Sequence, residues 1–116
     1  MRESIIEKKS FEFALKIIEL YKKLLEQNEY VLSKQLLRSG TSIGANVTEA
    51  TAAQSKKDFI TKMSIASKEA RETKYWLTLL SKSKLVNIYF NDYLLEIDEL
   101  IKILTSIVKT SQESNK

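Results

Sequence analysis

Apolar residues recur at steps of three and four along most of the chain, which is the period of amphipathic α-helices. Four segments carry this pattern: about 10–27, about 29–53, 55 to a break at 83–87, and about 91 onward. The chain has no proline and only two glycines in 116 residues, so little in it would interrupt helices of this length.

Each segment presents one apolar stripe that we expect to face a protein core. In the first segment the stripe comprises Phe11, Ala14, Leu15, Ile18, Tyr21 and Leu25. In the second it comprises Leu32, Leu36, Ile43, Val47 and Ala50. The third carries Phe59, Met63, Ala66, Ala70, Thr73, Leu77 and Leu80, and the fourth carries Phe90, Leu94, Ile97, Ile101, Leu104 and Val108.

Polar residues that favour helix starts precede three of the stripes. Ser4 with Glu7, or else Ser10, is placed to cap the first helix. Ser55 is the predicted cap of the third helix, and Asn91 is the predicted cap of the fourth.

The links between the predicted helices are short, so neighbouring helices are expected to run antiparallel. Alternating steps of three and four are typical of helices that pack nearly parallel, knobs into holes. We therefore predict an all-α fold, an antiparallel up-down four-helix bundle formed by a single domain over residues 1–116. Its ends are expected to fray over about residues 1–8 and 111–116.

The stretch "LLRSGTSIGANVTEA" holds both glycines, Gly40 and Gly44. A phosphate-binding loop needs Lys and Ser or Thr directly after its last glycine, whereas Ala45 and Asn46 follow here. The alternative is a helix interior made thin so that a neighbouring backbone can approach closely. We predict that Gly44 lies inside the second helix and faces a neighbouring helix at close range.

The chain has no cysteine and no histidine, which excludes disulfides, thiolate nucleophiles and the usual zinc ligands. Glu69 and Glu72 are three residues apart, but carboxylate-bridged metal bundles also use histidine. The spacings from Lys68 to Glu72 and from Asp58 to Lys62 favour ion pairs within one helix. We expect no enzyme activity, no catalytic residues, no metal and no cofactor.

Nineteen Lys and Arg against 15 Asp and Glu give a net charge of +4, which permits binding to nucleic acid without requiring it. The start of the sequence, "MRESIIEKKSF", does not resemble a signal peptide. No apolar run approaches the length of a membrane span. The expected location is the cytoplasm, with no membrane partner.

Cations lie on the predicted helix surfaces beside hydroxyl groups. One side of the third helix, away from its apolar stripe, carries Lys57, Thr61, Ser64, Lys68, Arg71 and Tyr75. Such groups suit phosphate and sugar contacts, although a face that is only solvated would look the same. The candidate nucleic-acid-binding residues are Lys34, Arg38, Lys57, Lys68 and Arg71.

Two further lines of residues suggest contacts between subunits, because each extends beyond the stripe that a four-helix bundle buries. The alternative is a wide core face. The candidate interface residues are Ile65, Glu69, Glu72 and Trp76 on the third helix, with Tyr93 and Leu100 on the fourth.

Two stretches, "LSKQLLRSGTSIGANVTEA" and "QSKKDFITKMSIASKEARETKYWLTLL", carry a more specific signal. They resemble the bacterial four-helix-bundle proteins encoded by intervening sequences of 23S ribosomal RNA genes. The resemblance runs from "EKKSFEFAL" through "LTLL" and more loosely into the fourth segment. It rests on Arg38, Ser39, Ser42, Ile43, Gly44, Asn46, Glu49, Phe59, Ala66, Glu69, Ala70, Glu72, Thr73, Trp76 and Leu77.

The resemblance implies a homopentamer of antiparallel four-helix bundles that forms a short barrel with a central opening. It also implies no known enzyme activity and no catalytic residues. Related proteins include accessory subunits of diversity-generating retroelements, which bind nucleic acid and a reverse transcriptase. Two hypotheses therefore stand: an oligomer that binds RNA or DNA, and a protein–protein adaptor such as an accessory subunit of a reverse transcriptase.

Overall fold

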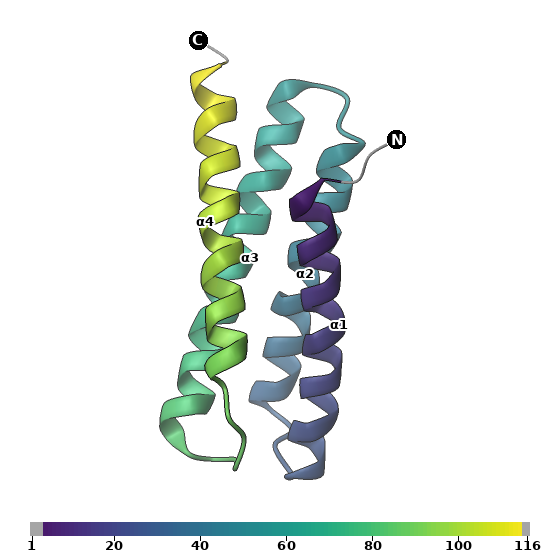
Figure 1. Cartoon of the computed structure of the whole chain (residues 1–116). Coiled ribbons are helices and arrows are strands. Elements are labelled where there is room, and N and C mark those ends of the chain that lie inside the picture. The colour runs from purple at the N-terminus through teal and green to yellow at the C-terminus, as the bar shows by residue number, and fades with distance from the viewer. Residues whose placement is uncertain (1–3, 115–116) are drawn as a thin grey trace.

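The computed structural model describes residues 4–114, which form four helices and, within that range, no strand. The helices are α1 (Ile5–Glu26), α2 (Leu32–Thr51), α3 (Lys56–Ser83) and α4 (Asn91–Glu113). They form one elongated bundle (Figure 1). The predicted all-α four-helix bundle is therefore confirmed.

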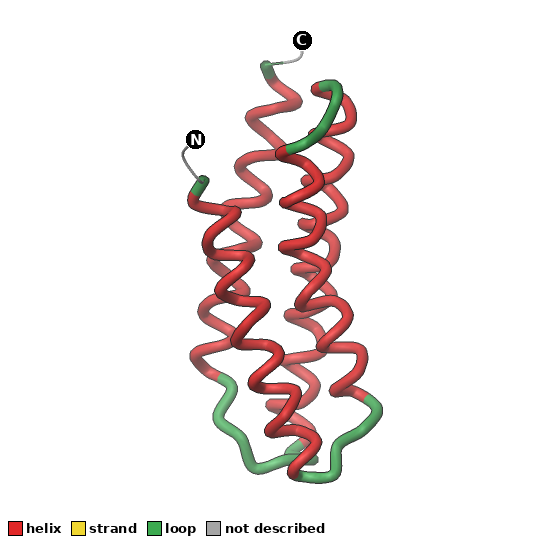
Figure 2. The backbone as a smooth tube through the Cα atoms, turned by 90° about the vertical axis from the view of Figure 1, so that its right-hand side faces the viewer, coloured by secondary structure: helices red, strands yellow, loops and turns green. Residues whose placement is uncertain are grey.

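The two ends of the bundle differ in which connections they carry. The start of α1, the end of α4 and the α2–α3 loop lie at one end, and the other two loops lie at the opposite end (Figure 2). Helix α2 packs against α1 and α3, and α3 packs against α4. Helices α1 and α4 approach each other much less closely, which leaves an open seam between the first and last helices.

The helix starts follow local hydrogen bonding. Of the two predicted caps for α1, the structure uses Ser4. The Ser4 hydroxyl accepts the backbone N–H of Glu7, and the Glu7 carboxylate accepts the backbone N–H of Ser4. The predicted cap of α3 is confirmed, since the Ser55 hydroxyl accepts the Asp58 N–H at 3.0 Å. The predicted cap of α4 is wrong, because Asn91 is the first helical residue and its side chain contacts Tyr89 instead.

Helix α2 begins without a capping hydroxyl. The carboxylate of Glu29 instead accepts the backbone N–H groups of Leu32 at 3.1 Å and Ser33 at 2.7 Å. The Glu29 carboxylate thereby satisfies two backbone N–H groups that have no partner within the helix, and its negative charge complements the positive end of the helix dipole. Helix α2 therefore starts three residues later than the predicted position 29.

The helices continue into both segments that were expected to fray. Helix α1 begins at Ile5 and α4 runs to Glu113. The remainder of those segments, residues 1–3 and 115–116, lies outside the described residues. Among residues 4–114, no helix is long and apolar enough to cross a membrane.

The predicted core stripe of α1 is wrong. Phe11 is 64% exposed and Leu15 is 51% exposed, and Ile18 also lies at the surface. The face that is buried comprises Ile6, Ser10, Phe13, Ile17, Leu20 and Leu24. Both stripes have helical spacing, and the buried one places a small residue, Ser10, against the thin part of α2.

The predicted stripes of the other helices are largely buried. On α3 every member is buried except Phe59, which is half-buried against the core. On α4 the predicted stripe also faces the core, although Leu94, Ile101 and Val108 are only half-buried. Leu100, which was not in the stripe, is part of the core and is 2% exposed. Leu100 is therefore part of the bundle's own interior and is not available as a contact residue between subunits.

The two glycines bring α1 and α2 together. A Cβ atom on Gly40 would lie 2.9 Å from a methyl carbon of Ile17. A Cβ atom on Gly44 would lie 3.3 Å from the backbone carbonyl oxygen of Ser10. The prediction that Gly44 lies inside a helix and faces a neighbouring helix at close range is confirmed.

Candidate nucleic-acid interface

The outer face of α3 presents the three cations that were predicted on it, and all three are exposed. Lys57 and Lys68 are eleven residues apart, about three helical turns, so both project from the same side. Arg71 lies one turn beyond Lys68, towards α4. Within residues 4–114 none of the three forms an ion pair, so their charge remains available to an anionic partner.

Arg71 is held in place by a neutral partner. Its Nη2 donates to the hydroxyl oxygen of Thr105 on α4 at 3.2 Å. The hydroxyl carries no charge, so the guanidinium is positioned without being neutralised. Among the described residues, Arg71 is therefore the one of these three cations whose side chain forms a hydrogen bond.

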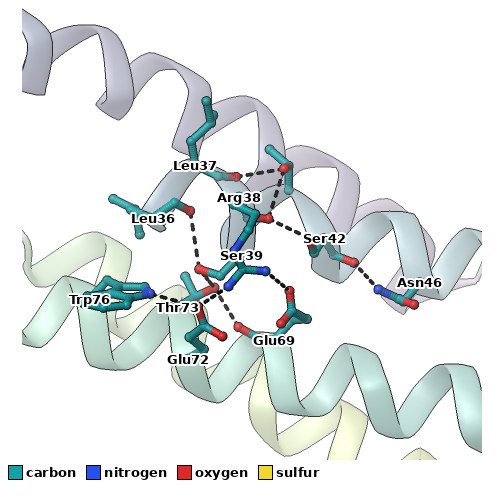
Figure 3. Close-up of polar contacts among 11 residues, drawn as sticks. Leu36, Leu37, Arg38, Ser39, Ser42, Asn46, Glu69, Glu72, Thr73 and Trp76 are labelled. Atoms are coloured by element: carbon teal, nitrogen blue, oxygen red, sulfur yellow. Dashed lines mark hydrogen bonds and ion pairs between the residues drawn. The ribbon is translucent and has the colours of Figure 1, made fainter. Parts of the chain in front are cut away.

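The two α2 candidates behave differently from each other. Arg38 pairs with both Glu69, at 2.8 Å, and Glu72 on α3 (Figure 3). Two carboxylates on one guanidinium oppose the approach of a phosphate, so the structure argues against Arg38 as a binding residue. Lys34 is exposed and forms no ion pair among the described residues.

Glu72 is also bound by an aromatic side chain. The indole N–H of Trp76 donates to its carboxylate at 3.1 Å (Figure 3). This hydrogen bond, and after it the bond from Arg38, lowers the pKa of Glu72 below that of an ordinary glutamate. In return the carboxylate of Glu72, more than that of Glu69, raises the pKa of Arg38. Three of the interface candidates, Glu69, Glu72 and Trp76, thus belong to a polar cluster that joins α2 to α3.

A hydroxyl pair lies directly beneath this cluster. The side-chain oxygens of Thr73 and Ser39 are 2.9 Å apart, and both residues are buried (Figure 3). Because both side chains are small, α2 and α3 approach closely here, and each hydroxyl also bonds to a carbonyl of its own helix. The α2–α3 contact therefore combines close packing with satisfied polar groups.

The predicted ion pairs within α3 are wrong. Lys62 pairs with Glu49 of α2 at 3.3 Å rather than with Asp58, and Glu72 pairs with Arg38 rather than with Lys68. The carboxylates are drawn to cations on the adjacent helix. Among residues 4–114, no group of His, Cys, Asp and Glu side chains is arranged to hold a metal ion.

Helix α1 exposes the apolar stripe that was expected in the core. Phe11, Leu15 and Ile18 lie along one side of it, and Leu95 is exposed on α4. Two open grooves lie between these helices, one of about 490 Å³ and one of about 570 Å³. The interface candidate Tyr93 lines the second groove, while Ile65 is exposed on α3.

Comparison with known proteins places the chain in a family. The family model described as "23S rRNA-intervening sequence protein" matches residues 2–106. The chain belongs to the 23S rRNA-intervening sequence protein family. The resemblance found from the sequence is thereby confirmed. No curated protein matches this chain.

A solved structure supports the same assignment. It is described as a protein with unknown function from the S23 ribosomal protein family of Bacteroides thetaiotaomicron VPI-5482. It shares 50% sequence identity with this chain, and the TM-score between them is 0.87. The match covers 90% of this chain and 99% of that one.

Many residues on which the resemblance to 23S rRNA-intervening sequence proteins rests gather where helices meet. Gly44 faces α1, Ser39 contacts Thr73, and Arg38 connects to the Glu69 and Glu72 carboxylates. These residues therefore account for how α2 packs against α1 and α3. The exposed lysines of α3 lie outside this set.

Sequence reasoning missed the α4 side of the candidate interface. Lys102, Thr105 and Lys109 recur at steps of three and four, so they share one face of α4. That spacing could have identified them as a polar stripe. Their proximity to Arg71 could not have been predicted, because it depends on how α3 and α4 pack.

Proposed function

We propose that this protein is a non-enzymatic oligomer of the cytoplasm that binds RNA or DNA through the outer face of α3. The observation that carries the proposal is the row of Lys57, Lys68 and Arg71, which are exposed and without a carboxylate partner among the described residues. Hydroxyl groups of Thr61 and Ser64 lie along the same side. Cations with hydroxyls bind phosphate groups and carry little sequence information, so binding is expected to depend weakly on sequence.

We infer that assembly strengthens this modest charge. The exposed stripe of Phe11, Leu15 and Ile18 on α1 is an apolar surface that a second copy of the chain would cover. A ring of antiparallel bundles repeats the α3 cations once per subunit and so raises the local positive potential. A homopentamer is the assembly that we propose, and that number comes from the family resemblance.

The test is a filter-binding titration with structured RNA and with single-stranded DNA at several salt concentrations. Replacing Lys57, Lys68 and Arg71 together by Gln is expected to preserve the oligomer and weaken binding. On a single strand, the slope of log affinity against log salt should fall by about 0.7 for each phosphate that the variant no longer neutralises. The matched control replaces Lys8, Lys23 and Lys84 by Gln, which removes the same charge from exposed positions outside α3.

Equal losses of affinity in the two variants would show that the α3 face is not the binding surface. An intact oligomer that binds neither nucleic acid at low salt would refute nucleic-acid binding altogether.

The second candidate function is a protein–protein adaptor, such as an accessory subunit of a reverse transcriptase. The exposed apolar stripe of α1 favours it, because such a surface suits a protein partner as well as a second copy. The position of the gene separates the two candidates. A location inside a 23S ribosomal RNA intervening sequence supports the first, and a neighbouring reverse transcriptase gene supports the second.

A further inference from the structure

A pocket of about 280 Å³ lies between α3 and α4. Its lining comprises Ser64, Ser67, Arg71, Thr105, Val108, Lys109 and Gln112. The two cations come from different helices and face one space, and no carboxylate lines it. At this size the pocket falls at or below the small end of ligand sites, which run from about 300 to 1,000 Å³. It suits a small anionic group better than a large apolar ligand.

The donors around this pocket are largely unused. Arg71 gives one N–H to Thr105 at 3.2 Å, and the guanidinium has further N–H groups to offer. The hydroxyl of Ser67 makes no hydrogen bond among the described residues, and neither does that of Ser64. Lys109 has no ion pair within residues 4–114, whereas Lys74, which lies outside this pocket, pairs with Asp98 at 2.7 Å.

The positive charge continues along the same groove. A second open space of about 460 Å³ shares Arg71 and is also lined by Lys74, Asp98 and Lys102. Lys102 and Lys109 are seven residues apart on α4, which is about 10 Å along the helix. The groove therefore offers cations over a length that exceeds one phosphate group, with a single carboxylate along it.

The other side of α4 has the opposite character. The groove of about 490 Å³ between α1 and α4 is lined by three glutamates and two lysines, and both lysines already pair with glutamates there. An anion would meet net negative charge in that groove. The difference between the two sides of one helix assigns anion binding to the α3–α4 groove.

We propose that the α3–α4 pocket binds a phosphodiester group of a nucleic-acid backbone. Arg71 and Lys109 contact the phosphate oxygens from opposite helices, and the hydroxyls of Ser64 and Ser67 donate to the same group. Lys102 is placed for an adjacent phosphate. This inference rests on the proposed function and adds to it a defined site, with an α4 wall that the sequence did not reveal.

The first test uses small probes, so that it does not depend on nucleic-acid binding. Backbone amide chemical shifts of the intact protein are followed by NMR during titration with dimethyl phosphate, a phosphodiester, and with inorganic phosphate. Amides of residues 64–71 and 105–112 are expected to shift and saturate in the wild type. The shifts should disappear when Lys109→Gln is combined with Ser64→Ala and Ser67→Ala. Unmoved amides in the wild type with both probes would overturn the site.

The second test measures affinity for a single-stranded oligonucleotide. Lys109→Gln should reduce the salt slope by about 0.7 for each pocket that the bound strand occupies, because each pocket contacts one phosphate. The double variant Ser64→Ala with Ser67→Ala removes two hydrogen bonds and no charge, so it should weaken binding about thirtyfold, about fivefold for each typical hydrogen bond, and leave the slope unchanged. Lys8→Gln is the charge-matched control.

The outcomes separate this inference from the proposed function. Wild-type binding that neither pocket variant weakens more than Lys8→Gln would overturn the pocket and leave nucleic-acid binding by α3 standing. Saturation by inorganic phosphate together with no response of these amides to the oligonucleotide would overturn the assignment to a nucleic-acid backbone. An oligonucleotide that does not bind at all would refute both.

Discussion

Gly44 and Gly40 set how closely α1 and α2 approach, and each glycine faces a different kind of group on α1. Gly44 faces a backbone carbonyl of α1, whereas Gly40 faces the branched side chain of Ile17. The role of the glycines could be predicted, because the apolar period of α2 continues through them without a break. Their partners could not, because that required the correct face of α1.

Replacing Gly44 by Leu tests the close approach. The leucine side chain would have to displace the Ser10 backbone, so the free energy of unfolding should fall by about 1–3 kcal/mol. Ala45→Leu is the control, because Ala45 is exposed on the same helix and its change should lie within about 0.5 kcal/mol. Thermal or denaturant unfolding of both variants at one protein concentration measures the difference. A Gly44→Leu protein as stable as the wild type would contradict the close packing.

Glu72 gives the fold a dependence on acid. Its pKa in the folded protein is lowered, first by the Trp76 indole and then by Arg38, below the unfolded value of about 4.3. The unfolded state therefore takes up the proton at higher pH than the folded state does. The stability that Glu72 contributes is fully present above the unfolded pKa and is lost as pH falls through the folded pKa.

Comparison with Glu72→Gln isolates this effect. The wild type should be more stable than the variant at neutral pH, and the difference should shrink as pH falls from the unfolded pKa of glutamate, about 4.3, through the lowered pKa of Glu72 in the folded protein. Trp76→Phe keeps a ring and removes the N–H, so it should move the Glu72 pKa, measured by NMR, back towards the ordinary value. A stability difference that stays constant from neutral to acid pH would contradict the assigned role.

At the scale of the helix, α1 shows where periodicity alone is insufficient. It carries two apolar stripes with the same spacing, one through Phe11 and Leu15 and the other through Phe13 and Ile17. The second stripe is the buried one, because Ser10 and Ile17 pack against the glycines of α2. On α3, the apolar residues of the second line, Ile65 and Trp76, share their face with Glu69 and Glu72. No second fully apolar stripe therefore competed for burial, and the predicted α3 stripe was confirmed.

Matched truncations on α1 distinguish its two faces. Ile17→Ala removes a fully buried side chain and should lower the free energy of unfolding by about 2–5 kcal/mol. Leu15→Ala removes a side chain that is half exposed in the isolated chain, so it should affect subunit association more than helix packing. Denaturant unfolding and light scattering on the same samples report the two effects. Equal loss of stability without any change in mass would contradict the assignment of the faces.

At the scale of the whole molecule, the bundle could be predicted from the sequence, whereas the surface that we propose for binding could be predicted only in part. Helix count, the α3 core and its cap follow from spacing and capping chemistry. The ion pairs of Arg38, which argue against it as a binding residue, could not be predicted because Glu69 and Glu72 are more than thirty residues away in sequence. Lys109 was missed for the same physical reason, since only the packing of α4 on α3 brings it to Arg71.

The central claim is that the chain forms a ring whose α3 cations bind nucleic acid electrostatically. Its most direct test is the mass of the particle by light scattering after gel filtration, with and without a single-stranded oligonucleotide, at about 50 mM and about 500 mM salt. Five chains of 13.4 kDa predict a particle of about 67 kDa at both salt concentrations. The oligonucleotide should add to that mass at low salt and dissociate at high salt, because counterion release drives binding. A particle of one chain's mass, or one that gains no mass at low salt, would contradict the claim.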